Sequence, residues 1–153
     1  MNTFRFRLQQ LLDFRIDRQI QSQRNLAAAL RALAREEELL AAMYRELTSY
    51  YDEWNEQRKH FADISDVLIY NRYLGRLERT LKEQLVRIRQ QEELVARVRA
   101  ALIQATKDKK VMERLKEKHY QEFTETINKL EQNFLDEIAT RPFAVSPPAA
   151  AAP

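Results

Sequence analysis

Residues 60–66, with the sequence HFADISD, form the one clear break in a long helical pattern. Asp63 and Ser65 are both suited to begin a new helix, because their side-chain oxygens can accept hydrogen bonds from the unpaired N–H groups of a first turn. The segments on either side show no other break. The sequence therefore predicts two long helices, at about 4–60 and 66–140.

The composition agrees with a chain that turns rarely. The chain has 153 residues, of which 32% are charged, with one glycine, four prolines and no cysteine. Glycine supplies the positive-φ positions of tight turns, so hairpin meanders, Rossmann folds and phosphate-binding loops are all disfavoured. The four prolines all follow residue 141. Pro142 should end the second helix, and 142–153 is predicted to be a disordered Pro/Ala tail.

Apolar residues in both helices recur at alternating steps of four and three, which is the heptad pattern of a left-handed coiled coil. A short connection between two such helices makes them antiparallel neighbours. The predicted fold is all-α, an antiparallel coiled-coil hairpin over 1–141. Its seam should contain Leu26, Leu30, Leu33, Leu40, Tyr44, Leu47, Tyr51 and Trp54 from the first helix, and Leu74, Leu77, Leu81, Ile88, Val95, Val98, Leu102, Ala105 and Met112 from the second, with Gln84, Gln91 and Lys109 in its gaps.

The two predicted helices differ in length. Pairing outward from the turn places residue 4 opposite about residue 122, so some 18 C-terminal helical residues, roughly 27 Å, should project alone. This projection carries Ile127, Leu130, Phe134 and Ile138. Exposed apolar surface of this kind usually marks a binding site for a partner.

The sequence contains no recognisable catalytic or metal-binding motif, and we expect neither enzymatic activity nor a cofactor. His60 and His119 are far apart in the sequence, outside any zinc-binding spacing. Net charge is +3, with both signs spread along the chain, which argues against a nucleic-acid-binding tail. The N-terminal stretch has charges where a signal peptide is apolar, and we expect a cytoplasmic protein.

Three segments stand out, and each admits a structural and a functional interpretation. The run FRFRLQQLLDFR at 4–15 could cover the helix end or anchor an anionic partner through its arginines. The basic segment KDKKVMERLKEK at 107–118 could be a solvated face or a site for an acidic partner or nucleic acid, although its interleaved acidic residues weaken the nucleic-acid alternative. An aromatic cluster could fill the hairpin tip or provide interface anchors; it comprises Tyr44, Tyr50, Tyr51, Trp54, Phe61, Tyr70 and Tyr73.

Together these motifs resemble the FliJ family, the small coiled-coil component of the bacterial flagellar export apparatus. The resemblance covers about residues 4–140. It rests on the run at 4–15, on YNRYLGRL at 70–77, on the basic segment at 107–118, and on EQNFLDEIA at 131–139. Gly75, inside the second of these motifs, departs from the family pattern.

The resemblance implies a non-enzymatic stalk, similar in fold to the two-helix stalk of rotary ATP synthases. Family members bind the pore of the hexameric flagellar ATPase FliI, contact the export gate protein FlhA, and escort unloaded export chaperones at the inner face of the membrane. The ATPase-binding residues would be Arg5, Arg7, Arg15, Lys116, Lys118, Phe134, Asp136 and Ile138. The gate-binding residues would be Tyr44, Leu47, Tyr51, Tyr73 and Leu77.

Two other interpretations remain open on the sequence. One is the equivalent stalk of a virulence-type secretion system, which has the same architecture, although the FRFR start and the DEIA ending favour the flagellar form. The other is a structural coiled coil that self-associates into a dimer or four-helix bundle, with Phe134 and Ile138 buried in the self-interface.

Overall fold

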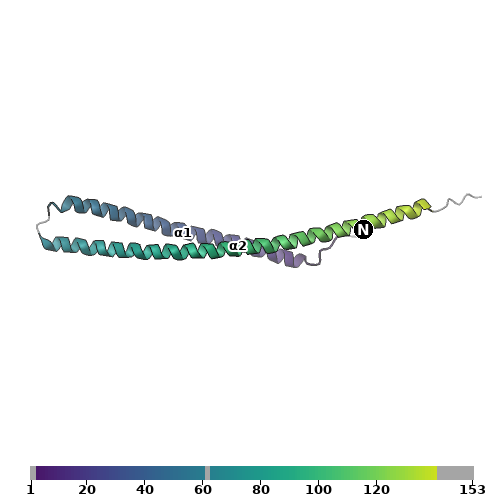
Figure 1. The fold of residues 1–153 in the computed structure, drawn as a ribbon, viewed down its shortest axis with the longest axis horizontal. Coiled ribbons are helices and arrows are strands. Elements are labelled where there is room, and N and C mark those ends of the chain that lie inside the picture. The colour runs from purple at the N-terminus through teal and green to yellow at the C-terminus, as the bar shows by residue number, and fades with distance from the viewer. Residues whose placement is uncertain (1–2, 61–62, 141–153) are drawn as a thin grey trace, which may run out of the picture.

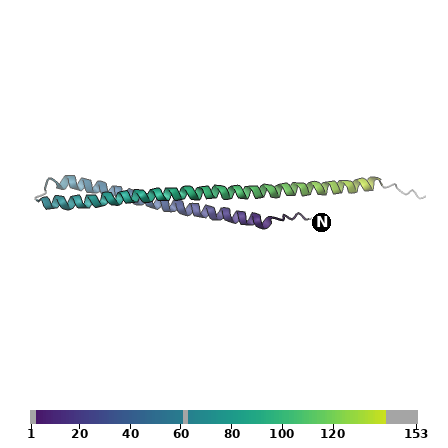
Figure 2. The same cartoon turned by 60° about the horizontal axis from the view of Figure 1, so that its bottom comes forward.

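A computed structural model describes residues 3–60 and 63–140, and this part of the chain is a hairpin of two helices (Figure 1). Helix α1 spans Gln9–Gln57 and helix α2 spans Ile64–Thr140. We call the end where the two helices are connected the closed end, and the other end the open end. The helices lie side by side from the closed end, and α2 continues well beyond α1, as a second view also shows (Figure 2). The predicted all-α antiparallel hairpin is therefore confirmed. The predicted disordered tail at 142–153 lies outside the described residues.

The start of α2 depends on one capping residue. Helix α2 begins at Ile64, two residues before the predicted start, and Asp63 precedes it directly. The pKa of Asp63 lies below its ordinary value because its carboxylate accepts hydrogen bonds from the hydroxyl of Ser65, and then from the backbone N–H groups of Ser65 and Ile64. Asp63 is thus the residue that caps α2, and Ser65 lies inside the first turn.

The seam of α2 agrees with the predicted heptad pattern. Its buried residues follow steps of four and three from the closed end toward the open end. Gln84 fills a gap in the apolar series, as predicted, and is the most deeply buried side chain, with 2% of its surface exposed. The buried set is Tyr70, Leu77, Leu81, Gln84, Ile88, Val95, Ala105 and Met112.

The predicted seam of α1 is wrong at three of its eight residues. Leu30, Tyr44 and Tyr51 are exposed, between 40% and 46%. The residues one position earlier in the chain take their places in the seam. Both series repeat every seven residues, so periodicity alone does not separate them. The seam of α1 therefore runs through Leu26, Ala29, Leu33, Glu36, Leu40, Met43, Leu47, Tyr50 and Trp54, all buried or half-buried.

The N-terminal segment is not helical as predicted. Residues 3–6 have no regular secondary structure, residues 7–8 form a turn, and the segment packs on α2. The ring of Phe4 lies 5.3 Å from that of Tyr120 and 5.6 Å from that of Phe123. Phe6 is buried against Leu12 and Met112. Because α1 begins only at Gln9, Phe6 is buried and Phe4 is half-buried through contacts with α2, and neither belongs to α1. The predicted opposition of residue 4 and about residue 122 holds.

Candidate functional site

Exposed apolar side chains lie on the part of α2 that extends past the N-terminal segment. We call residues 124–140 the overhang. Apart from Ile127, which is half-buried, every residue of the overhang is exposed, including Leu130, Phe134 and Ile138. Four acidic residues and one basic residue give the overhang a net negative charge. The predicted lone amphipathic helix end is therefore present.

The predicted basic residues of the open end fall into two groups. Arg5 and Arg7 are exposed and form no ion pair within residues 3–60 and 63–140. Lys118 is also exposed, with only a long 3.9 Å contact to Glu122. Lys116, in contrast, is half-buried and donates a 2.8 Å hydrogen bond from Nζ to Oε1 of Gln9. Lys116 therefore helps to hold the two helices together.

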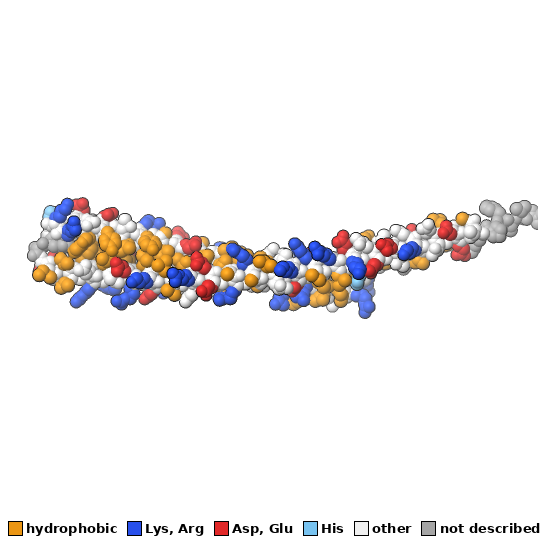
Figure 3. All heavy atoms as spheres, in the orientation of Figure 1, with side chains coloured by type: hydrophobic (Ala, Val, Ile, Leu, Met, Phe, Trp, Pro, Cys, Tyr) orange, Lys and Arg blue, Asp and Glu red, His pale blue; other side chains and the backbone are white. Residues whose placement is uncertain are grey.

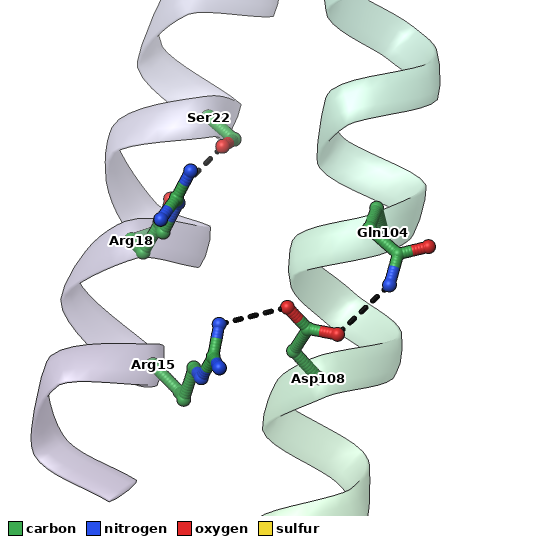
Figure 4. A network of polar contacts seen from close by, with 5 residues as sticks. All are labelled: Arg15, Arg18, Ser22, Gln104 and Asp108. Atoms are coloured by element: carbon green, nitrogen blue, oxygen red, sulfur yellow. Dashed lines mark hydrogen bonds and ion pairs between the residues drawn. The ribbon is translucent and has the colours of Figure 1, made fainter. Parts of the chain in front are cut away.

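Arg15 also belongs to the hairpin itself. Its Nη1 lies 2.9 Å from Oδ2 of Asp108, across the seam, and Gln104 Nε2 donates to the other oxygen of Asp108 at 2.8 Å (Figure 4). A groove of about 510 Å³ opens beside this network, between Arg18 and Gln104. Both partners of the ion pair are about one-third exposed, so we expect it to contribute less than about 1 kcal/mol.

Several residues of the basic segment at 107–118 pack or pair within the hairpin, so the segment does not form a continuous open patch of positive charge. Met112 is buried in the seam. Asp108 binds Arg15, and Lys109 pairs with Glu113 at 3.4 Å. Because acids within the segment neutralise part of its charge, the solvated-face interpretation fits better than a nucleic-acid site.

At the closed end, four aromatic residues form a packed cluster between the helices. The rings of Tyr50 and Tyr70 stack at 4.0 Å, Trp54 lies 4.2 Å from Tyr70, and Tyr73 lies 4.4 Å from Tyr50. The hydroxyls of Tyr50 and Tyr70 each donate to the other residue's backbone carbonyl. Burial raises the pKa of both tyrosines, and the neighbouring Glu53 adds to the effect. We call these four residues the aromatic clasp. They fill the tip of the hairpin and do not form an outer surface for a partner.

The five residues predicted to bind the export gate do not share one surface. Tyr44 and Tyr51 are exposed on the same side of α1, since they are seven residues apart. The hydroxyl of Tyr73 donates to Oε1 of Glu46 at 2.5 Å, which raises the pKa of Tyr73. Glu46 comes two residues after Tyr44 and so points about 200° away from it. Tyr73 therefore lies on the opposite flank of the rod.

The two leucines of that predicted set lie between these flanks. Leu77 is buried in the seam, with 8% of its surface exposed, and Leu47 is half-buried. Neither leucine forms the outer surface that a partner would touch first. The candidate patch is therefore reduced to Tyr44 and Tyr51, and we call this pair the tyrosine flank. Figure 3 shows apolar side chains gathered along the closed-end half of one face, with charges of both signs around them.

Sequence reasoning missed two features of the molecule. One is that the segment before Gln9 is not helical, so Phe6 is buried by packing on Leu12 and Met112. The alternation of phenylalanine and arginine in FRFR is the signal for this, because alternate residues of a strand-like backbone point to opposite sides. The other is a polar contact in the seam, where Gln84 Nε2 donates to the backbone carbonyl of Glu36 at 3.0 Å and to its carboxylate at 2.5 Å. The sequence does not show which residue of α1 lies opposite Gln84, and the structure identifies it as Glu36.

Across the described ranges, no group of three or more His, Cys, Asp or Glu side chains is placed to hold a metal ion. None of the described helices is long and apolar enough to cross a membrane. His119, one of the two histidines, packs edge-on against Phe6 at 5.8 Å. The surface of the described residues carries three features: an acidic overhang, exposed arginines beside it, and a tyrosine flank near the closed end.

These features define a rod-like helical hairpin of the kind that works by contact with other proteins. A search against models of protein families matches residues 4–147 to the family described as Flagellar FliJ protein. The match spans nearly the whole chain, and the chain belongs to the flagellar FliJ family. Members of this family are non-catalytic structural or adaptor proteins with a stalk-type role in flagellar protein export. Searches of curated proteins and of solved structures found no match.

Proposed function

We propose that this protein is the stalk of the flagellar export ATPase complex. In this proposal the open end enters the central pore of the hexameric ATPase FliI and promotes its assembly and activity. The single observation that carries the proposal is the overhang, because a lone, exposed amphipathic helix at one end of a rigid rod can enter a narrow ring.

The residues that would face the ATPase are those exposed at the open end. They include Arg5 and Arg7 on the N-terminal segment and Phe134, Asp136 and Ile138 on the overhang. Lys118 lies nearby on α2 and is exposed as well. A single stalk in a six-fold ring makes non-equivalent contacts, and mixed surface charge suits such weak contacts better than one apolar plug.

Arg15 and Lys116 would act on this site from within the hairpin. Arg15 binds Asp108 and Lys116 binds Gln9, so both tie the N-terminal part of α1 to α2. Their replacement would loosen the segment that presents Arg5 and Arg7. We therefore assign them a positioning role and leave direct contact with the ring to the exposed residues.

The tyrosine flank would bind the export gate protein FlhA. Tyr44 and Tyr51 expose 46% and 40% of their surfaces, and tyrosine is enriched in protein interfaces. Glu78 of α2 lies beside this flank, 3.5 Å from the Tyr51 hydroxyl. Export chaperones complete the proposed set of partners. These contacts would hold the protein on the cytoplasmic side of the membrane at the flagellar base.

Truncation tests the ATPase assignment. Removal of residues 124–153 deletes the overhang but keeps the seam and the contacts of Phe4 and Phe6. We expect this variant to stay helical and to lose its stimulation of FliI hydrolysis. A truncation after residue 140 removes only the tail and is the control. Full stimulation by the shorter variant would show that the overhang is not the ATPase-binding element.

A paired substitution tests the gate assignment. Tyr44→Ala with Tyr51→Ala should weaken binding to purified FlhA about tenfold or more, because two exposed aromatic anchors are lost. Tyr73→Ala, on the opposite flank, is the matched control and should bind as the wild type does. If the Tyr73→Ala variant loses affinity while the double variant keeps it, the gate contacts the other flank.

A further inference from the structure

The outer face of α2 near the closed end carries a row of cations. Arg72 and Arg79 come two positions after the seam residues Tyr70 and Leu77, so they point about 200° away from the seam. Their neighbours on this face repeat with the 3.5-residue period of the seam, which keeps the row on one side of the rod. Figure 3 shows Lys and Arg side chains along the edge that α2 forms in the closed-end half. We call this row the basic stripe; its exposed residues are Arg72, Arg76, Arg79, Lys82 and Arg89, with Glu83 as the one acid among them.

The hairpin does not neutralise the charge of the basic stripe. None of its five cations forms an ion pair with any residue in the described ranges. Residues 64–89 of α2 include six basic and three acidic residues, a net charge of +3. Residues 31–57 of α1, which lie opposite, include three basic and seven acidic residues, a net charge of −4. The closed-end half of the rod is therefore positive along α2 and negative along α1, and only its α2 side suits an anionic surface.

Large apolar side chains are exposed between the basic stripe and the turn. Ile64 and Ile69 are the two most exposed large apolar side chains of the described residues, at 76% and 66%. Leu68 is 55% exposed and lies one helical turn after Ile64 on the same side of α2. We call these three residues the apolar tip. A helix face that combines exposed apolar side chains with Arg and Lys is typical of proteins that bind at a membrane surface.

We propose that the closed end of α2 docks on an anionic phospholipid membrane. The apolar tip enters the boundary between the headgroups and the acyl chains, and the cations of the basic stripe bind lipid phosphates. Arginine suits this position because its apolar stem can lie along the buried part of the interface while its guanidinium stays at the phosphates. The acidic side of α1 then faces away from the membrane, so the charge of the rod fixes which side docks.

The shape and chemistry of this surface favour a lipid layer over other anionic partners. A nucleic acid would pair with the cations but leave the apolar tip in water. A folded acidic protein would need a groove that matches the convex face of a single helix. A fluid layer of headgroups follows such a face without a groove, and it offers anionic and apolar groups within a few ångströms of each other.

Membrane docking leaves the surfaces of the proposed function free. The overhang begins roughly 50 Å further along α2 than Arg89. Tyr44 and Tyr51 lie on α1, outside the basic stripe and the apolar tip. Because the apolar tip is at the extreme end of the rod, the rod can meet the membrane end-on or tilted, and the overhang then extends away from it. The inference goes beyond the ATPase and gate assignments and does not depend on either.

Co-sedimentation of the full chain with lipid vesicles tests the proposal. The protein should bind vesicles of phosphatidylglycerol and phosphatidylcholine in equal parts, and should bind vesicles of phosphatidylcholine alone about tenfold or more weakly, because these lack net negative charge. Arg72→Gln with Arg79→Gln should weaken binding to the mixed vesicles about tenfold or more, since two cations leave the docking surface. Leu68→Gln with Ile69→Gln should weaken it about tenfold as well, because the apolar tip no longer enters the interface.

Two matched controls lie on α1, and circular dichroism shows that each variant keeps its helices. Arg18→Gln with Arg24→Gln makes the same change in net charge, and Leu30→Gln with Leu39→Gln makes the same loss of exposed apolar side chains; both should bind as the wild type does. Equal binding of the wild type to the two kinds of vesicle overturns the proposal. So does a stripe variant that binds as the wild type does, or a control that loses as much affinity. Binding to polyglutamate through the basic stripe without binding to vesicles would assign the stripe to an acidic protein and show that membrane docking is wrong.

Discussion

The polar contact in the middle of the seam should stabilise the hairpin measurably. Gln84 is 2% exposed, and its Nε2 donates to the carbonyl of Glu36 at 3.0 Å and to its carboxylate at 2.5 Å. A buried neutral hydrogen bond contributes about 1 kcal/mol and one to a charged group about 1.5–3 kcal/mol. Because Glu36 is half-buried and partly hydrated, we take the lower end for the carboxylate bond.

Gln84→Ala removes both hydrogen bonds and some seam packing. We expect it to lower the free energy of unfolding by about 3 kcal/mol. Glu36→Ala removes only the carboxylate bond, since the backbone carbonyl remains. A double-mutant cycle of the two substitutions therefore isolates that bond, and we expect a coupling energy of about 1.5 kcal/mol.

Urea denaturation followed by helical circular dichroism measures these free energies. Gln91→Ala is a matched control, because it is a half-buried seam glutamine whose Oε1 has no hydrogen-bond partner in the described part of the chain. Its loss should be clearly smaller than that of Gln84→Ala. A coupling energy below about 0.5 kcal/mol would refute the claim that the Gln84–Glu36 contact stabilises the seam.

Three further predictions concern the two ends of the rod. Gly75→Ala should raise the free energy of unfolding by about 0.5–1 kcal/mol, read from urea midpoints, because the added methyl meets no atom and alanine favours helix. Phe6→Ala should cost up to about 3 kcal/mol in the same assay and speed tryptic cleavage at Arg7, since the N-terminal segment loses its buried anchor. In a pH titration, Tyr50, Tyr70 and Tyr73 should ionise above the ordinary tyrosine pKa of 10.0, because burial or the Glu46 hydrogen bond favours their neutral forms. The stability they confer is then fully present below pH 10 and is lost as the pH rises through their raised pKa values; ionisation coincident with free tyrosine in absorbance at 295 nm would contradict this.

The fold could be predicted from the sequence because its main determinants are local or periodic. One break with a capping aspartate, a single glycine and a 3.5-residue apolar period specify two helices and their antiparallel pairing. The residues that lie opposite each other at the open end could also be predicted, because counting outward from the turn pairs the two helices. Phe4 lies against Tyr120 and Phe123, close to the predicted partner at 122.

The seam of α1 could not be assigned from period alone. Two series one residue apart, through Leu30 or through Ala29, repeat every seven residues, and the series predicted from the sequence is the one that the structure leaves exposed at the edge of the seam. Packing between the helices decides between them: Ala29, Met43 and Tyr50 enter the seam, while Leu30, Tyr44 and Tyr51 stay exposed at its edge. The same shift of one residue separates Tyr73 from Tyr44 and divides the predicted gate patch.

The edge positions of this coiled coil hold much of its capacity for specific contact. On such a narrow rod the seam buries one row of residues from each helix, so a tyrosine one position away stays at the surface while its neighbour enters the aromatic clasp. Tyr50 and Tyr51 illustrate this: the first stacks on Tyr70, and the second stays 40% exposed beside Glu78. Of these two adjacent residues, one packs between the helices and closes the hairpin, and the other remains on the surface where a partner can contact it. A substitution that moved the register of α1 by one residue would exchange these roles, so the polar contact of Gln84 with Glu36 helps to maintain the binding surface as well as the fold.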